Sequence, residues 1–306
     1  MKVGVIVPQG WTGEYDGWDP SRAWDRTVAV ARQAEGLGFE SVWLFDHFTT
    51  TPRPADELTF ESFTALAALA ALTERVRLGH IVICNGFRNP ALTAKMISTM
   101  DVISGGRMEL GIGAGWKRDE WLAYGYGFPE TKARLAALGD ALEVITRMVV
   151  PGREARATFA GEHAGVSGAI NQPKPLQRPR IPIIVGGNGR RVTLGIAVEF
   201  ADELNLVFLT PERLAEALPN IRTRCEEEGR DPATLKVSLY TRDEDVRVPG
   251  QARVDLLGTL QDLGLSRAVC FPGRWSTELD VQARFAEDCR AAGLEMAEAA
   301  ASGAKR

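Results

Sequence analysis

The stretch VRLGHIVICNGFRNPALTAKMISTMDVISGGRMELGIGAGW, residues Val76–Trp116, decides the fold. It begins with an apolar run of strand length and a polar loop. A helix follows, in which Leu92, Met96, Met100 and Ile103 recur at helical spacing. A tight turn, a second apolar strand and a glycine-rich loop complete the stretch. This order predicts one and a half units of a βα barrel, whose active sites form in the loops that follow the strands.

The same alternation of apolar strands and amphipathic helices extends along the chain, which is typical of a parallel βα protein. The predicted strands are Lys2–Val7, Ser41–Phe45, Val76–Ile83, Arg107–Ile112, Pro182–Val185, Asp202–Val207, Leu235–Leu239 and Ser266–Phe271. Predicted helices begin near Ser21, Phe60, Leu92, Leu135, Gly187–Arg191, Pro211, Gln251 and Thr277. Eight strand–helix units favour an α/β fold of the closed (β/α)8 TIM-barrel type over an open doubly wound sheet.

One stretch interrupts this alternation. Between Pro151 and Arg180, glycine and proline cluster, and Thr158–Phe159 forms a short β-like piece. We therefore expect a single domain over residues 1–306, with an insertion on the barrel rim at about 151–180.

The composition argues against several classes of protein. With 36 basic and 40 acidic residues the net charge is −4 and no basic block occurs, so neither nucleic acid nor a membrane surface is an expected partner. No apolar stretch is long enough for a signal peptide or a membrane span, and four scattered cysteines suit reduced thiols in a cytoplasmic protein. Three histidines are too few for most metal-dependent barrel hydrolases, so no metal site is expected.

Asp46 and His47 directly follow the second predicted strand, which points them to the barrel mouth. His47 could donate a proton or a hydrogen bond near neutral pH, with Asp46 orienting it; a purely structural pair is an equally weighted alternative. His80, inside the third strand, is predicted to be a buried structural histidine, and His163 to lie on the surface. The remaining acids near these loops are interpreted as exposed charges: Glu61, Asp119 and Glu120.

The loops after the first and last strands hold further candidates. Gln9 is a predicted cofactor contact, and Trp11 and Trp18 form either an aromatic lid over the substrate or a loop packed on its own aromatic rings. Arg274 and Trp275 follow the eighth strand and either bind substrate at the same mouth or form an exposed turn.

Two glycine-rich loops predict a cofactor edge. The run Gly111–Trp116 imitates a dinucleotide fingerprint, but no helix opens at once, so close approach to a flat ring is the better interpretation. Its ring-facing members are Ala114, Gly115 and Trp116. After the fifth strand, glycines open a helix and favour phosphate binding over a merely tight turn. The residues concerned are Gly186, Gly187, Asn188 and Gly189, with Asn205 of the sixth strand as a side-chain donor at the same rim.

Four segments together resemble the luciferase-like flavin and deazaflavin oxidoreductases. The resemblance is strongest to the bacterial subgroup that uses coenzyme F420, a deazaflavin hydride carrier. The segments are GLGFESVWLFDHF (Gly36–Phe48), ERVRLGHIVICNGFRNPALTAK (Glu74–Lys95), ISGGRMELGIGAGW (Ile103–Trp116) and PIIVGGNGRRVT (Pro182–Thr193). They occur in the family's order and spacing, and the resemblance covers about residues 1–240.

The resemblance implies that the deazaflavin ring lies across the barrel mouth, with its phosphate at Gly186–Gly189. It implies a bulge behind the ring at Ile81 and Val82, often with a non-proline cis peptide. His47 matches the family's histidine after the second strand and Asp46 its acidic neighbour, which implies proton delivery or charge stabilisation while a hydride moves between ring and substrate. The family also implies a homodimer.

Two departures from the family bear on the substrate. Sugar-phosphate and alcohol dehydrogenases of the family carry an acid where this chain has Trp116, and the sugar-phosphate enzyme has a tryptophan near Thr51. These differences favour a reducible organic molecule over glucose-6-phosphate or a simple alcohol. Two alternatives stay open: an FMN-dependent monooxygenase of the same fold, and a ligand-binding barrel without catalysis.

Overall fold

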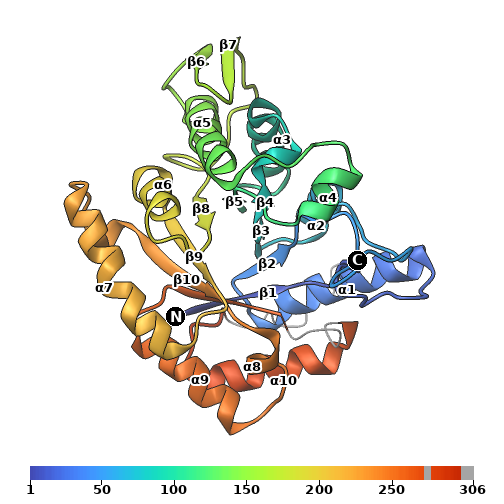
Figure 1. Ribbon diagram of the computed structural model, residues 1–306. Coiled ribbons are helices and arrows are strands. Elements are labelled where there is room, and N and C mark those ends of the chain that lie inside the picture. Colours follow the sequence, from blue (N-terminus) through green and yellow to red (C-terminus); the bar gives the residue numbers. More distant parts are fainter. Residues whose placement is uncertain (272–276, 298–306) are drawn as a thin grey trace.

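Parallel strands form a closed ring in the computed structural model, which describes residues 1–271 and 277–297 (Figure 1). The strands are β1 (Lys2–Ile6), β2 (Ser41–Leu44), β3 (Arg77–His80), β4 (Ile83–Cys84), β5 (Met108–Gly113), β8 (Ile183–Gly186), β9 (Glu203–Val207), β10 (Lys236–Tyr240) and β11 (Arg267–Cys270). β11 pairs with β1, and β3 pairs with β5 as well as with β2, so the ring closes. β3 and β4 both pair with β5 and together fill one strand position of the ring. The ring therefore has eight strand positions, and the predicted (β/α)8 barrel is confirmed.

Helices surround the ring (Figure 1). They are α1 (Pro20–Leu37), α2 (Ser62–Leu72), α3 (Pro90–Ile103), α4 (Arg118–Ala123), α5 (Thr131–Val149), α6 (Val192–Phe200), α7 (Pro211–Glu227), α8 (Asp243–Val246), α9 (Gln251–Asp262) and α10 (Leu279–Ala291), with short 3-10 turns at Asn85–Phe87 and Pro232–Thr234. In the described part of the chain, none of these helices combines the length and apolar character that crossing a bilayer requires.

Helix starts followed local signals in most cases. The Thr210 hydroxyl accepts a hydrogen bond from the backbone N–H of Arg213. Pro211 occupies the first turn of α7, so the predicted start near Pro211 is confirmed. The predicted start of α6 within 187–191 is wrong, because Gly187 has a φ of 136° and the helix begins only at Val192. The short helices α4 and α8 were not predicted at all.

The third strand is interrupted where the bulge was predicted. β3 ends at His80, β4 begins at Ile83, and the Ile81–Val82 peptide between them is cis, so this prediction is confirmed. The Val82 side chain lies against β5 and β8. A Cβ atom added at Gly113 or Gly186 would come within 3.0 Å of its methyl carbons. Glycine at these two positions therefore makes room for the bulge.

Residues 151–180 contain an antiparallel hairpin, β6 (Ala157–Ala160) and β7 (Gly165–Ala169), which agrees with the predicted β-like piece. The hairpin packs on α5, on the side away from the barrel strands (Figure 1). Asp140 of α5 accepts hydrogen bonds from the backbone N–H groups of His163 and Ala164 at 2.7 and 3.3 Å. The stretch is thereby fastened along a barrel helix, and the His163 side chain is exposed, as predicted.

Side chains fill the lower part of the barrel interior. An apolar layer consists of Ile6, Trp43, Phe45, Ile81, Ile184, Tyr240, Val269 and Phe271. Below it, at the amino ends of the strands, Arg267 forms ion pairs with Glu109 at 2.5 Å and with Glu203 at 3.7 Å. Side chains fill this end of the barrel, and their charges are paired. A ligand therefore has to enter from the opposite end, at the carboxyl ends of the strands.

Candidate active site

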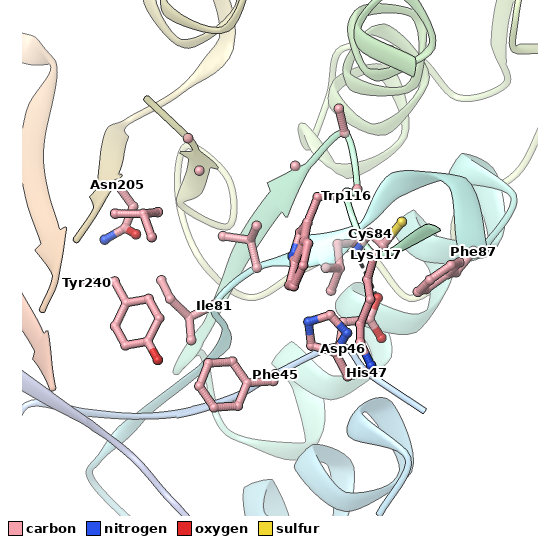
Figure 2. Close-up of a pocket in the computed structure, with 18 of the residues that line it drawn as sticks. Phe45, Asp46, His47, Ile81, Cys84, Phe87, Trp116, Lys117, Asn205 and Tyr240 are labelled. Carbon is pink, nitrogen blue, oxygen red and sulfur yellow. Dashed lines mark hydrogen bonds between the residues drawn. The ribbon is translucent and has the colours of Figure 1, made fainter. Parts of the chain in front are cut away.

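A cavity of about 510 Å³ opens at the carboxyl ends of the strands (Figure 2). Its wall is formed by Trp11, Phe45, Asp46, His47, Ile81–Cys84, Phe87, Gly113–Lys117, Trp121, Gly186, Gly187, Asn205, Val207, Phe208 and Tyr240. Loops and strand ends from most of the barrel contribute to it. Its position is that of barrel active sites, and its size suits a flat ring together with a small second molecule.

His47 is held on this wall by three contacts. Its Nδ1 lies 2.7 Å from Oε2 of Glu120. Its ring stacks on Trp11, with centroids 4.4 Å apart and planes 3° apart, while Trp116 meets it edge-on at 5.8 Å. Among the described residues, Nε2 of His47 has no hydrogen-bond partner. The imidazole is therefore fixed through Nδ1, which leaves Nε2 available to a ligand.

Glu120 is the functional residue that the sequence interpretation missed, because it counted this acid among the exposed charges. The side chain is fully buried on α4, and Oε1 accepts hydrogen bonds from the backbone N–H groups of Phe48 and Thr49 at 3.1 and 3.2 Å. Burial alone would raise the pKa of Glu120. The hydrogen bond from His47 and the charges of His47 and Lys117 nevertheless hold it below its ordinary value. An ionised Glu120 orients His47 through Nδ1.

Asp46 does not orient His47, and the prediction that it does is wrong. Its two oxygens form a bidentate pair with Arg88 at 2.7 and 2.9 Å. They also accept hydrogen bonds from the backbone N–H of Cys84 at 2.8 Å and from the Ser62 hydroxyl at 2.9 Å. Consecutive residues at a strand end point to opposite sides, so Asp46 faces Arg88 while His47 faces Glu120. Asp46 joins the ends of β2 and β4 beneath the cavity.

Lys117 is a second missed residue. It is 5% exposed, lines the cavity, and its Nζ lies 3.2 Å from the backbone oxygen of Thr50 and 3.5 Å from Oε1 of Glu120. Its charge is compensated by Glu120 and by Asp119 at 3.6 Å. Both Lys117 and Glu120 lie just after Trp116, at the start of α4 and within it. The sequence pattern predicted no helix there, so it gave no sign that these side chains are buried.

The wall opposite His47 and Trp116 carries an unpaired acceptor (Figure 2). Asn205 is buried, and its Nδ2 donates to the Ser238 hydroxyl at 2.8 Å. Its Oδ1 has no partner within the described residues. A buried acceptor without a donor destabilises a protein, and the ring N–H of a flavin or deazaflavin would satisfy it. With Ile81 and Val82 also in the wall, these residues fit such a ring.

The glycine loop after β8 is divided between two cavities. Gly186 and Gly187 line the one described above, whereas Gly187, Asn188 and Gly189 line a neighbouring cavity between α6 and α7. The Asn188 side chain is bonded in both directions to the backbone of Val207, at 2.8 and 2.9 Å, and so cannot turn to a ligand. No side chain caps the start of α6, so its first N–H groups suit an anion such as phosphate.

Glycine in the other predicted loop serves internal packing. A Cβ at Gly115, where φ is 81°, would lie 2.4 Å from Sγ of Cys84. Ala114, Gly115 and Trp116 nevertheless form part of the cavity wall. The sequence pattern indicated that glycine here makes room for a flat ring. In the structure, glycine at 115 makes room for the Cys84 side chain.

Two predicted site residues lie away from the cavity. The Gln9 amide donates to the backbone oxygens of Phe45 and Phe60 at 3.0 Å and its Oε1 accepts from the N–H of Phe45 at 2.8 Å, so the side chain joins two loops. Trp18 packs on Tyr15 instead of the cavity wall. The predictions for Arg274 and Trp275 fall outside the described residues.

Sequence comparison reveals two kinds of relative. The F420-dependent glucose-6-phosphate dehydrogenase of Intrasporangium calvum is 35% identical over 187 residues, which are 60% of this chain and 53% of that protein. The chain thus matches about half the length of these dehydrogenases. Pyrimidine monooxygenase RutA of Stutzerimonas stutzeri is 28% identical over 255 residues, 80% of this chain and 69% of that protein.

A solved structure shares the fold. An F420-dependent secondary alcohol dehydrogenase, in complex with an F420-acetone adduct, superposes with a TM-score of 0.75 at 17% identity, covering 92% of this chain and 97% of that one. The family model for luciferase-like monooxygenases matches residues 1–242, which include the mouth from Trp11 to Tyr240. The chain therefore belongs to the luciferase-like monooxygenase family.

Proposed function

We propose that this protein is an oxidoreductase that transfers a hydride between coenzyme F420 and a small organic substrate. The observation that carries the proposal is His47 in the cavity wall, with Nδ1 bound to Glu120 at 2.7 Å and Nε2 open to a ligand. The 35% identity to F420-dependent dehydrogenases supports the choice of cofactor. When bound, F420 would supply or accept the hydride, that is, one proton together with two electrons.

The described residues suit this role in three ways. Ile81 and Val82 would form an apolar backing for the flat ring, and Oδ1 of Asn205 would accept a hydrogen bond from its N–H group. The backbone at Gly186–Gly189 and the uncapped start of α6 would hold the phosphate.

His47 balances the charge of the transfer. A substrate that gains a hydride needs one proton to end neutral, and Nε2 of His47 delivers it; in the reverse direction the same nitrogen removes it. Glu120 fixes the ring through Nδ1 and stabilises the cationic imidazole, so it acts as a positioning residue. The apolar wall of Trp11, Phe45 and Trp116 limits the access of water to this exchange.

An FMN-dependent monooxygenase is the second candidate function. It is supported by the 28% identity to pyrimidine monooxygenase RutA, which covers more of the chain than the dehydrogenase match does. The Asn205 acceptor and the glycine loop fit a flavin as well as a deazaflavin, so a binding experiment has to separate the two.

That experiment titrates the purified protein with F420 and, separately, with FMN, and measures binding by cofactor fluorescence. We expect F420 to bind and FMN to bind at least 10-fold more weakly. Tight FMN binding without F420 binding overturns the proposal in favour of the monooxygenase. Binding of neither cofactor favours a ligand-binding barrel without catalysis.

We further propose that residues 1–306 form one domain that acts as a homodimer in the cytoplasm. Helices α2 and α3 leave Leu72, Leu92 and Ile103 exposed, which suits contact with a second copy. The four cysteines are buried and free of disulfides, which suits a reducing compartment. Light scattering tests the dimer: Leu92→Glu should shift it to monomers, and a monomeric wild-type protein overturns this part.

A further inference from the structure

Two large aromatic side chains on the cavity wall are exposed where most such side chains in this protein are buried. Trp116, after β5, is 64% exposed, and Phe208, after β9, is 49% exposed. Exposed apolar side chains of this size that line a cavity point to a ligand that covers them. Both line the mouth, so a ligand bound there can contact them.

Phe208 is held in an unusual backbone conformation. Its φ of 57° places it in the left-handed region, and no other non-glycine residue in the described ranges has a positive φ. Its backbone N–H donates to the oxygen of Tyr240 at 2.9 Å and its ring packs on Tyr240 at 4.7 Å. A strained backbone that presents an aromatic ring to a cavity is typical of a binding site.

Trp116 and Phe208 belong to opposite walls. Figure 2 shows Trp116 beside His47 and Lys117 on one side of the cavity, and Tyr240 with Asn205 on the other. Since the Phe208 ring contacts Tyr240, it extends the second wall. A molecule in the mouth therefore lies between two aromatic side chains, next to Nε2 of His47.

Apart from the backbone N–H groups after β8, which we assign to the cofactor phosphate, the wall does not suit a phosphorylated or carboxylated substrate. Lys117 is compensated by Glu120 and Asp119, and Asp46 by Arg88. Within residues 1–271 and 277–297, the cavity wall thus offers no unpaired cation to an anionic group. Apolar and aromatic surface dominates the contact area instead.

We propose that Trp116 and Phe208 form an aromatic clamp that selects a flat, uncharged ring system as the substrate and discriminates against sugar phosphates. The inference rests on the proposed function, because the clamped molecule has to share the cavity with the cofactor and reach His47. Stacking between two aromatic rings favours flat molecules. A carbonyl oxygen on such a molecule could accept a hydrogen bond from Nε2 of His47.

The test uses menadione as the flat, uncharged probe and glucose-6-phosphate as the anionic one. F420 binding is measured first by fluorescence, and each probe is then titrated into the F420-loaded protein by calorimetry. Failure of F420 binding overturns the proposed function, whereas F420 binding without menadione binding overturns only the clamp. We expect menadione to bind the loaded protein and to bind at least 10-fold more tightly than glucose-6-phosphate.

Variants then assign the binding to the two rings. Trp116→Ala and Phe208→Gly should each weaken menadione binding about 3- to 10-fold, since each removes one stacked ring. Glycine adopts a positive φ without strain, so Phe208→Gly introduces no backbone strain at this position, and its melting temperature checks that the variant is folded. Trp18→Ala is the matched control, because Trp18 is also exposed but does not line the cavity. The affinity of this variant for menadione should stay unchanged.

Three further results overturn the clamp. The first is equal affinity for the two probes. The second is unchanged menadione affinity in both Trp116→Ala and Phe208→Gly. The third is binding of menadione only to the cofactor-free protein, because the two aromatic rings would then hold the cofactor ring itself.

Discussion

The two ends of the barrel interior both bury a glutamate, and the partner of that glutamate decides what each end does. At the lower end, Glu109 faces the guanidinium of Arg267. At the mouth, Glu120 faces the imidazole of His47. Arginine keeps its proton at every pH a protein meets, whereas histidine exchanges its proton near neutral pH. The lower end is thus an ion cluster that closes the barrel, whereas the mouth carries the group that the proposed proton transfer requires.

The pKa shifts follow the same division. Burial opposes ionisation of Glu109, but Arg267 and Arg77 hold its pKa below the ordinary value. Arg267 in turn has a raised pKa, since its acidic neighbours outweigh its burial. Glu203 shares the same arginine and has a raised pKa because burial prevails there. One guanidinium therefore ties three acids together, Glu40, Glu109 and Glu203, without offering any of these groups to a ligand.

Removing the imidazole at the mouth should have the largest effect. His47→Ala is expected to lower kcat by about 10²–10⁴, because the proton donor is lost. The variant also leaves Glu120 buried without its imidazole partner, so the melting temperature should fall, and rates are compared at a temperature at which both proteins are folded. Steady-state rates with reduced F420 as the hydride donor and menadione as the acceptor measure this. A kcat within threefold of wild type would exclude His47 as the proton donor.

At the lower end, Arg267→Met should reduce stability instead of chemistry. It leaves Glu109 and Glu203 buried without their shared partner, which is expected to destabilise the fold by about 3–5 kcal/mol. Urea unfolding at pH 7 measures the loss. Arg213→Met is the control: its pair with Glu216 is exposed on both sides, so the change should stay below about 1 kcal/mol. Equal losses in the two variants would refute the distinction between the ends.

Glu120→Gln tests whether the mouth needs its acid. It retains a hydrogen-bonding group but loses the charge that stabilises cationic His47, so kcat should fall about 10- to 100-fold while F420 affinity stays unchanged. Asp46→Asn, on the far side of the same strand end, serves as comparison. We expect it to change stability more than the pH profile of kcat. A pH profile that is altered by Asp46→Asn and not by Glu120→Gln would reverse our assignment.

The lowered pKa of Glu120 also predicts a pH dependence of stability. In the unfolded chain this carboxyl takes up a proton at a higher pH than in the folded protein. Its contribution is therefore complete above the ordinary glutamate pKa and is lost as the pH falls through the lowered folded value. Urea unfolding between pH 7 and pH 3 should show a smaller loss for Glu120→Gln than for wild type; identical curves would argue against the ion pair.

The smallest effects concern the glycines behind the cavity. Gly186→Ala would press a methyl group against Val82 and is expected to cost about 1–3 kcal/mol and to weaken F420 binding. Gly139→Ala, inside α5 with no atom near the added carbon, should instead stabilise the protein by up to about 1 kcal/mol. Thermal unfolding of the pair measures both. A neutral Gly186→Ala would mean that the bulge does not need this space.

Much of the barrel could be predicted because its signals are local. Strand-length apolar runs, helical periodicity, and caps such as Thr210 with Pro211 depend on a few neighbouring residues. His47 could be placed for the same reason, since a residue that directly follows a strand faces the mouth. The bulge at Ile81–Val82 required the family resemblance, because no local propensity distinguishes it from an ordinary strand.

The partner of His47 could not be predicted in this way. Glu120 is 73 positions further along the chain and lies on a helix of only six residues, so neither proximity nor periodicity connects the two. Asp46 is adjacent in sequence, which is why the sequence pattern offered it as the group that orients His47. Gln9 follows the first strand and is predicted to contact a cofactor, but its amide joins two loops.

The sequence by itself determined the order of strands and helices, the closed barrel and the histidine at its mouth, because alternating burial and chain order dictate them. Tertiary structure alone decided which of several acids meets His47, which glycines serve the Val82 bulge, and which aromatic side chains stay exposed at the mouth. Those outcomes depend on contacts between segments that are remote in the chain. Closing the barrel creates these contacts, and no local pattern encodes them.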